Sequence, residues 1–196
     1  MNFLAHAYLS FNDENILVGN MISDFVKGSS KNNFSAAIQN GIMLHREIDT
    51  YTDHHPDTHL AKEIFRLDYR LYSAPIVDIL FDHFLANDET IFTDEILKAF
   101  SLKVYSSLQN YAGILPFNFY RVFQYMQKEN WLYGYRTIDS MQRSLKGLSV
   151  RASYMKESET AFNLFKSNYS SLKTLFSHFF PDVKQFTKDR FRKFST

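Results

Sequence analysis

Apolar residues recur at intervals of three or four positions along most of the chain. Between positions 38 and 51 they are Ile38, Ile42, Leu44, Ile48 and Tyr51, and between 76 and 85 they are Ile76, Ile79, Leu80, Phe84 and Leu85. This spacing places apolar side chains on one face of an α-helix, whereas a half-buried strand would alternate at every second residue. The pattern therefore predicts a helix in each stretch, with Pro75 in the first turn of the second.

The same periodicity extends over the rest of the chain. We expect further helices over residues 2–9, 14–26, 93–115, 117–127, 137–148 and 152–179, with Gly28 ending the second and Pro116 and Pro181 interrupting the pattern. Six Gly and four Pro in 196 residues are too few for the frequent turns of a β-sandwich. No repeat or linker composition divides the chain. We predict an all-α fold in a single compact multi-helix domain over residues 1–196.

Composition narrows the class of protein. Hydrophobic residues make up 45% of the chain, enough for a sizeable core, and the absence of cysteine excludes disulfides, thiolate zinc sites, Fe–S clusters and a cysteine nucleophile. The first residues lack the basic segment of a secretion signal, and apolar runs such as residues 16–18 are far too short to span a bilayer. We therefore expect a soluble, cytoplasmic protein with no membrane partner.

The net charge of +1 conceals an uneven distribution. Residues 1–98 hold seven Lys and Arg against 15 Asp and Glu, whereas residues 99–196 hold 15 against six. Six of the seven histidines also lie in the acidic half. A half rich in histidine and carboxylate suggests a metal site, and a basic half suggests an anionic partner or substrate.

His45 and Asp49 are the first candidates for a metal site. They lie four positions apart in a strongly helical stretch, with Asp53 one turn further, so their side chains project from one face. An imidazole and a carboxylate at that spacing can share one divalent ion. The same pair also suits a solvated helix face or a helix-stabilising contact.

Asp82 and His83 are the second candidates, because they interrupt an apolar run from Ile79 to Leu85. Two adjacent ionisable groups in such a run are costly to bury without partners. Adjacent helical side chains point about 100° apart, so one ion takes both directly only if it lies between their faces. Otherwise one of the two binds the metal and the other orients it by a hydrogen bond, a role that Asp78, one turn earlier, could also fill. A third possibility is that the helix turns one of the two residues to solvent.

His6 and Asp24 are single polar residues on the apolar flanks of the first two expected helices, where such a residue is more often a hydrogen-bonded core residue than a ligand. If the helices converge, a set of His and Asp without sulfur suits Mn²⁺, Fe²⁺, Mg²⁺ or Zn²⁺. We expect His54, His55 and His59, around Pro56, to form a surface connection between helices. Glycine-rich phosphate loops, a G-x-S-x-G elbow and H-E-x-x-H are absent.

With these residues in view, the sequence resembles the acyl carrier protein phosphodiesterase family, also called acyl carrier protein hydrolase. The matching stretches are Asn2-Phe3-Leu4-Ala5-His6, Gly19-Asn20, Ser23-Asp24-Phe25-Val26-Lys27-Gly28, Gly41-Ile42, His45-Arg46, Ile48-Asp49, Thr52-Asp53, Pro56, Ala74-Pro75, Asp78, Asp82-His83-Phe84-Leu85, Trp131-Leu132, Tyr135-Arg136 and Asp139. The resemblance covers nearly the whole chain in order.

The resemblance implies hydrolysis of the phosphodiester between the 4′-phosphopantetheine arm and a serine of holo acyl carrier protein, a reaction of fatty acid and lipid metabolism. It also implies a remote, HD-domain-like relation to metal-dependent phosphohydrolases that are all-α and use His and Asp ligands. One departure stands out, because the dyad reads Asp82-His83, the reverse of the usual His-Asp order.

On this basis we expect His45, Asp82 and His83 to bind the metal, and His6, Asp24 and Asp49 to act as further ligands or as bases that orient water. Manganese is the metal expected first, with Mg, Fe or Zn as alternatives, since a divalent ion lowers the pKa of bound water and neutralises phosphoryl charge. Arg46 and Arg136 are the candidate phosphate contacts, because a guanidinium matches phosphate oxygens.

The basic half then provides a surface for an acidic protein substrate. Acyl carrier proteins are small and acidic, so a positive face would steer their encounter. The expected docking cations are Arg121, Arg143, Lys146 and Arg151, followed by Lys184, Lys188, Arg190, Arg192 and Lys193 of the tail. Two other functions stay open: an HD-like phosphohydrolase of nucleotides or small phosphoesters, and a non-catalytic binding module. No nucleic-acid motif is present, and the sequence predicts no oligomeric state.

Overall fold

The structure is a computed structural model that describes residues 1–152, 154–155 and 157–194. Its helices are α1 (Phe3–Tyr8), α2 (Glu14–Ile22), α3 (Ala36–His54), α4 (Pro56–Tyr69), α5 (Ser73–Ala86), α6 (Asp94–Asn110), α7 (Phe117–Lys128), α8 (Trp131–Gly134), α9 (Ile138–Arg151), α10 (Glu159–Ser167) and α11 (Tyr169–Arg192). Short 3-10 helices cover η1 (Ser23–Phe25), η2 (Gly28–Asn33), η3 (Arg70–Tyr72) and η4 (Ala112–Ile114). The described residues contain no strand, which confirms the predicted all-α class.

Several expected helices differ from those of the structure, and α4 and α8 were not expected. A single helix was expected over 152–179, but α9 ends at Arg151, α10 covers Glu159–Ser167 and α11 begins at Tyr169. Pro181, expected to interrupt the pattern, lies inside α11. Phe179, Phe180 and Val183 are buried on both sides of it, so the packing of α11 keeps the helix continuous through the proline.

The connection around Pro56 is also shorter than expected. His54 is the last residue of α3, and His59 lies within α4. Only His55 separates the two helices, and its side chain accepts a hydrogen bond from the Asp57 N–H while Pro56 takes the first helical position. In place of the predicted polar connection, a single residue, His55, joins the two helices and caps the second.

The closest helix pair is α2 against α3, and two glycines make it possible. A Cβ added at Gly19 would collide with the carbonyl oxygen of Ile38, and one added at Gly41 would lie 2.5 Å from that of Ile16. The backbones therefore approach more closely than any larger side chain allows. This contact brings α2, with its buried polar residue Asn20, against the α3 face that carries His45.

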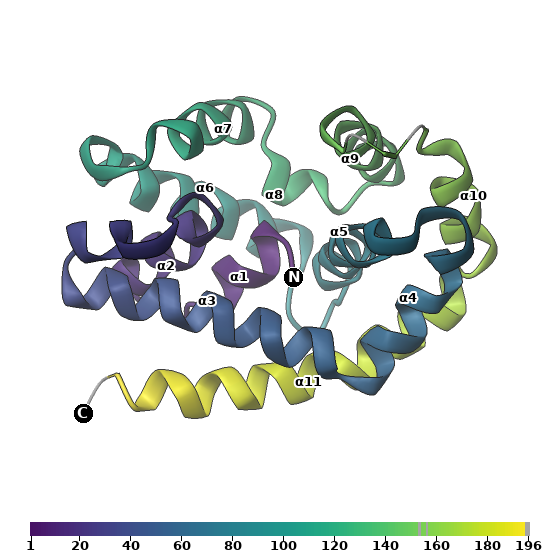
Figure 1. The fold of residues 1–196 in the computed structure, drawn as a ribbon, viewed down its shortest axis with the longest axis horizontal. Helices are drawn as coiled ribbons and strands as arrows, with labels where there is room; N and C mark the ends of the chain where they lie inside the picture. The colour runs from purple at the N-terminus through teal and green to yellow at the C-terminus, as the bar shows by residue number, and fades with distance from the viewer. Residues whose placement is uncertain (153, 156, 195–196) are drawn as a thin grey trace.

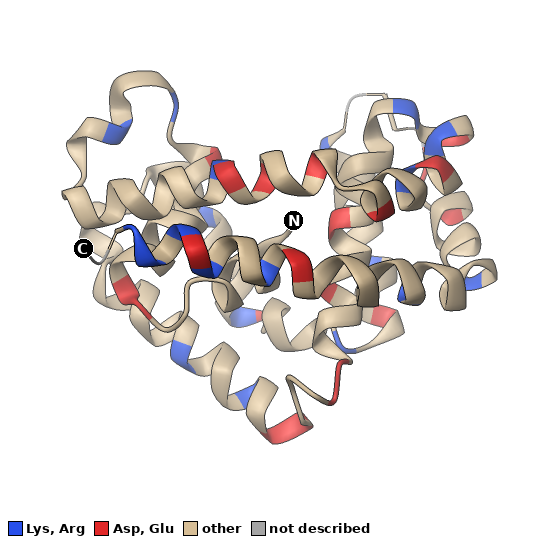
Figure 2. Cartoon of the chain, turned by 90° about the horizontal axis from the view of Figure 1, so that it is seen from below, with Lys and Arg blue, Asp and Glu red and all other residues tan. Residues whose placement is uncertain are grey.

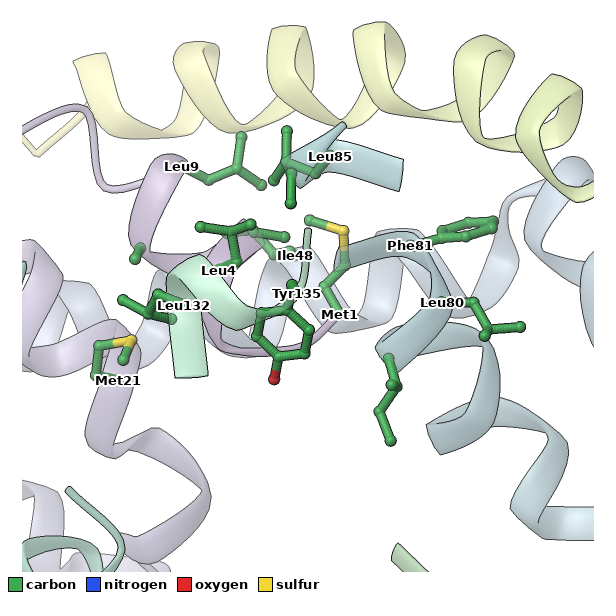
Figure 3. Close-up of a cluster of buried hydrophobic side chains, with 14 of the residues drawn as sticks. Met1, Leu4, Leu9, Met21, Ile48, Leu80, Phe81, Leu85, Leu132 and Tyr135 are labelled. Carbon is green, nitrogen blue, oxygen red and sulfur yellow. The ribbon is translucent and has the colours of Figure 1, made fainter. Parts of the chain in front are cut away.

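The first residues run through the middle of the molecule, and α11 runs along α3 and α4 (Figure 1). Buried side chains from several helices pack around the start of α1, including Met1, Leu4 and Leu85 (Figure 3). Asp82 of α5 accepts hydrogen bonds from the backbone N–H groups of Leu4 and Ala5, at 2.7 and 3.1 Å. These bonds satisfy free N–H groups at the N-terminal end of α1 and orient the helix that carries His6.

Among the described residues, none of the helices combines the length and the apolar character needed to cross a membrane.

Candidate metal centre

Three side chains that could hold a metal ion, His6, His45 and Asp49, meet where α1 contacts α3. His6 Nε2 lies 3.1 Å from Asp49 Oδ1, and His45 Nε2 lies 3.1 Å from Asp49 Oδ2. The two imidazole rings stack with their centroids 3.9 Å apart. Both histidines are buried, while 37% of the Asp49 side chain is exposed, so solvent reaches the group from the carboxylate.

Asp24 of η1 lies at the edge of this group. Its Oδ1 is 3.2 Å from His45 Nε2, and its side chain is 74% exposed. The hydrogen bond with His45 lowers the pKa of Asp24, which keeps the carboxylate ionised. The fold thus brings together four of the predicted residues: His6, Asp24, His45 and Asp49.

Asn20 of α2 determines which nitrogen of His6 faces Asp49. The Asn20 amide nitrogen donates to the His6 carbonyl oxygen at 3.0 Å and to Ser10 Oγ at 3.1 Å. The amide oxygen therefore faces His6 Nδ1, at 2.9 Å, and accepts its proton. In a neutral ring this leaves Nε2 with a lone pair pointing at Asp49 Oδ1.

Two lone pairs facing each other at 3.1 Å repel unless a cation lies between them. Ligand atoms held at right angles about 2.1 Å from one ion are ~3.0 Å apart, which matches the separations of the nitrogens from the Asp49 oxygens. Two imidazole nitrogens with carboxylate oxygens are also the donor set of Mn²⁺, Fe²⁺ and Zn²⁺ sites. The residues present therefore fit a divalent metal.

The ionisable side chains of this group shift one another's pKa values. Burial lowers the pKa of His6 to about 4. Burial also disfavours charge on His45, but hydrogen bonds to Asp24 and Asp49 outweigh it and raise the pKa of His45 to about 9. Burial acts to raise the pKa of Asp49, yet His6, the Met1 amine and His45 hold it below its usual range. Asp49 is thus a permanent anion, the form in which a carboxylate binds a metal.

The Met1 amine connects the centre to α5. It lies 3.1 Å from Asp49 Oδ1 and 3.2 Å from Asp78 Oδ1. Burial disfavours the charged amine, but Asp78 and Asp49 outweigh it and raise the amine pKa to about 11. Asp78 is itself buried, which raises its pKa. In the structure Asp78 therefore supports Asp49 through this amine.

Asp82 and His83 make other contacts. Both Asp82 oxygens accept the N–H groups that orient α1, and burial raises the pKa of Asp82 to about 7. His83 Nδ1 donates to the Tyr135 carbonyl oxygen at 2.8 Å, and its Nε2 lies 3.2 Å from the Tyr169 hydroxyl. Burial lowers the pKa of His83. The structure does not bring these two predicted ligands into the group of His6, His45 and Asp49.

The two predicted phosphate contacts differ in position. Arg46 follows His45 on α3, is exposed, and donates to the Val26 carbonyl oxygen at 3.0 Å, next to η1. Arg136 donates to the Ala86 carbonyl oxygen at 3.3 Å and lies 3.5 Å from Asp94, at the far end of α5. Only Arg46 lies beside the residues of the metal group.

Comparisons with known proteins agree with this reading of the sequence. The family described as acyl carrier protein phosphodiesterase matches residues 1–183. The chain belongs to that family. A curated relative with this name from Salmonella paratyphi A (strain ATCC 9150 / SARB42) is 32% identical over 182 residues, covering 92% of this chain and 94% of the relative. One from Enterobacter sp. (strain 638) is 30% identical over 191 residues, covering 97% and 99%. No solved structure matches the chain.

The predicted membership in the acyl carrier protein phosphodiesterase family is confirmed. The docking cations expected for such a protein are exposed, Arg121 on α7 and Arg143, Lys146 and Arg151 on α9. The tail cations lie on or just after α11, where Lys184 contacts the Tyr8 hydroxyl, Arg190 pairs with Glu47 and Arg192 pairs with Asp189. In the view of Figure 2, blue and red positions are mixed along the helices.

Sequence reasoning missed Asn20 and Ser10 as parts of the centre. Both are fully buried, and Asn20 lies in the apolar helix α2. A buried amide among apolar residues must find hydrogen-bond partners, and this was the available signal. His54 and His59 are exposed, as expected, and contact Thr50 and Glu63 of their own helices.

Proposed function

We propose that this chain is a metal-dependent phosphodiesterase of the cytoplasm that hydrolyses the 4′-phosphopantetheine arm from holo acyl carrier protein. The products are apo acyl carrier protein and 4′-phosphopantetheine. The observation that carries the proposal is the meeting of His6 Nε2 and His45 Nε2 with the two oxygens of Asp49. Membership in a family named for this activity supports the choice of substrate.

The metal is proposed to bind to His6, His45 and Asp49, with Mn²⁺ as the first ion to test and Mg²⁺, Fe²⁺ or Zn²⁺ as alternatives. A divalent ion supplies a nucleophilic water at neutral pH and stabilises negative charge on the phosphoryl oxygens. This differs from the expected ligand set, because Asp82 and His83 already bind backbone and tyrosine groups.

The remaining residues of the centre act on the substrate and on its water. Asp24 is exposed, and its Oδ1 lies 3.2 Å from the proposed ligand atom His45 Nε2, so its carboxylate can accept a proton from the attacking water. Arg46 is exposed beside η1, and the guanidinium N–H groups that do not bind the Val26 carbonyl oxygen can hold a phosphate oxygen. The exposed cations of α7 and α9 are proposed to attract the acidic carrier protein.

Incubating holo carrier protein with the Mn²⁺-loaded enzyme and measuring intact mass tests the proposal. We expect the carrier protein to lose the mass of the arm, and Asp49→Asn to reduce the rate by about 100-fold or more, since it weakens a ligand. Asp53→Asn, one turn further along α3 and paired with Lys62 at 2.6 Å, is the control and should match the wild type. An unchanged mass with metal bound would refute the substrate, and faster hydrolysis of small diesters would favour the alternative phosphohydrolase.

A further inference from the structure

A cavity of about 290 Å³ lies between the start of α1, α5, α8 and α9. Asn2 and Phe3 form one wall, Ile79 a second, and Trp131, Tyr135 and residues of α9 the others. Its volume is near the lower end of the ~300–1,000 Å³ typical of small-molecule sites. It is large enough to take part of an extended chain.

Residues of the cavity wall adjoin, along the chain, two groups at the edge of the metal centre, the Met1 amine and Asp78. Asn2 and Phe3 directly follow Met1, and Ile79 directly follows Asp78. The Met1 amine contacts both Asp49 and Asp78 at 3.1 and 3.2 Å. Consecutive Cα atoms are only about 3.8 Å apart, so the walls begin one residue from groups that touch a proposed metal ligand.

The cavity wall carries polar groups with hydrogen-bonding capacity that other described residues of the protein do not fill. Tyr135 is 4% exposed, and its hydroxyl points out of the hydrophobic cluster (Figure 3). Within the described residues, neither this hydroxyl nor the Arg151 guanidinium has a hydrogen-bond or ion-pair partner. Arg143 contacts only the neutral Ser140 Oγ, at 2.6 Å. The Tyr135 hydroxyl oxygen itself is not buried, so it faces the cavity, where a ligand can accept or donate a hydrogen bond.

Resting on the proposed function, we propose that this cavity binds the pantetheine part of the prosthetic arm while the phosphodiester lies at the metal centre. Pantetheine is an uncharged chain that alternates methyl and methylene groups with amides and a hydroxyl. Phe3, Ile79 and Trp131 supply apolar surface for its carbon groups. The Tyr135 hydroxyl and the arginine guanidiniums supply hydrogen bonds for its amide oxygens.

Binding is measured directly with pantetheine, which carries no phosphate, and metal-free enzyme. Trp131 is the only tryptophan of the chain and lines the cavity, so its fluorescence reports on one wall of it. We expect a saturable change in the wild type and at least about tenfold weaker binding in Gly147→Leu, which places a side chain in the cavity. A Cβ at Gly147 meets only Arg151 Nη1, at 3.5 Å, so the helix accepts it.

Two further variants keep the test decisive. Tyr135→Phe removes the hydroxyl without changing the volume and should weaken pantetheine binding by about fivefold or more. Gln142→Leu, exposed on α9 and outside the cavity lining, should bind as the wild type does. No fluorescence change with pantetheine, or equal binding by wild type and Gly147→Leu, would overturn the proposal.

Activity separates this inference from the proposed function. Gly147→Leu and Tyr135→Phe should raise KM for holo carrier protein while their Mn²⁺ affinity, measured by calorimetry, stays at the wild-type value. If the wild type releases the arm but these variants retain its KM, the proposed function stands and the cavity inference fails. If the wild type binds pantetheine but releases no arm, the cavity inference stands and the reaction fails.

Discussion

Asn20 determines which nitrogen of His6 carries the proton. It holds the proton of His6 on Nδ1 and thereby turns the Nε2 lone pair toward Asp49. Hydrogen bonds from outside the ligand set fix the tautomer and orientation of metal-binding histidines in this way. His45 has no equivalent support, because its Nδ1 is buried without a hydrogen-bond partner in the described part of the chain. His6 should therefore be the more sensitive of the two histidines to its surroundings.

Asn20→Leu should lower Mn²⁺ affinity about 10- to 100-fold, because the proton of His6 is no longer held on Nδ1. Nitrogen NMR of labelled histidine in the metal-free protein should show the loss of the Nδ1–H tautomer. Ser10→Ala is the matched control: it removes a partner of the Asn20 amide nitrogen but leaves the contact with His6 Nδ1 intact. An unchanged tautomer in Asn20→Leu would remove this role from Asn20.

The titration of His45 predicts how stability of the metal-free protein depends on pH. Its pKa rises from 6.5 to about 9 on folding, so the folded state holds the proton more tightly than the unfolded state. The resulting stability is fully present below 6.5 and is lost as pH rises through about 9. Urea unfolding should show that the deficit of His45→Gln relative to wild type shrinks over this window, by up to about 3 kcal/mol. A deficit independent of pH would contradict this assignment of the proton.

The sequence predicted contacts between residues that are close along the chain. It did not predict contacts between residues that are far apart along the chain. The spacing of His45 and Asp49 predicted their shared face, which their 3.1 Å contact confirms. For Asp82, the sequence indicated that a buried carboxylate needs partners, but its partners are backbone N–H groups 77 and 78 positions away. No pattern within α5 distinguishes a carboxylate that caps another helix from one that binds a metal.

At the scale of elements, the contact of α2 with α3 holds the metal group together. Gly19→Ala and Gly41→Ala should each destabilise the protein by about 1–3 kcal/mol or more, because the added methyl group meets backbone that cannot move aside. Chemical denaturation measures the loss. Gly147→Ala makes the same change in α9, where only a flexible arginine is near, and should be neutral or stabilising by up to about 1 kcal/mol. Equal effects in all three variants would mean that the helix contact is not as close as described.

The boundaries that the sequence mispredicted depend on tertiary contacts. Residues 152–158 contain neither Gly nor Pro, so nothing local ends the helix expected there. In the structure the Tyr69 hydroxyl donates to Glu157 and accepts from the Ala161 N–H, and Met155 is buried. The two hydrogen bonds of Tyr69 fix Glu157 and the first turn of α10 against α4. Most amphipathic stretches, in contrast, were predicted because each buries one face, but α4 (Pro56–Tyr69), which also buries one face, was missed.

At the scale of the whole molecule, charge governs how a protein substrate arrives. The division into acidic and basic halves of the sequence does not become two faces, since Figure 2 shows both signs on neighbouring helices. Arg190 and Arg192 of α11 are paired with Glu47 and Asp189. Lys146 on α9 is exposed, and no carboxylate pairs with it within the described residues. We therefore expect α9 to contribute positive charge to the surface that an acidic partner meets.

Salt should accordingly slow the reaction with the carrier protein. Raising ionic strength from 0.01 M to 1 M shortens the screening length from about 30 Å to about 3 Å, and kcat/KM for holo carrier protein should fall by about tenfold or more. Hydrolysis of a small diester, which needs no docking, should change little. Lys146→Glu should reduce kcat/KM for the carrier protein and flatten its salt dependence, whereas Lys188→Glu on α11 should have the smaller effect because it lies among ion-paired residues. If both variants retain the wild-type salt dependence, the carrier protein docks without help from either helix, and α7, with Arg121, becomes the surface to test.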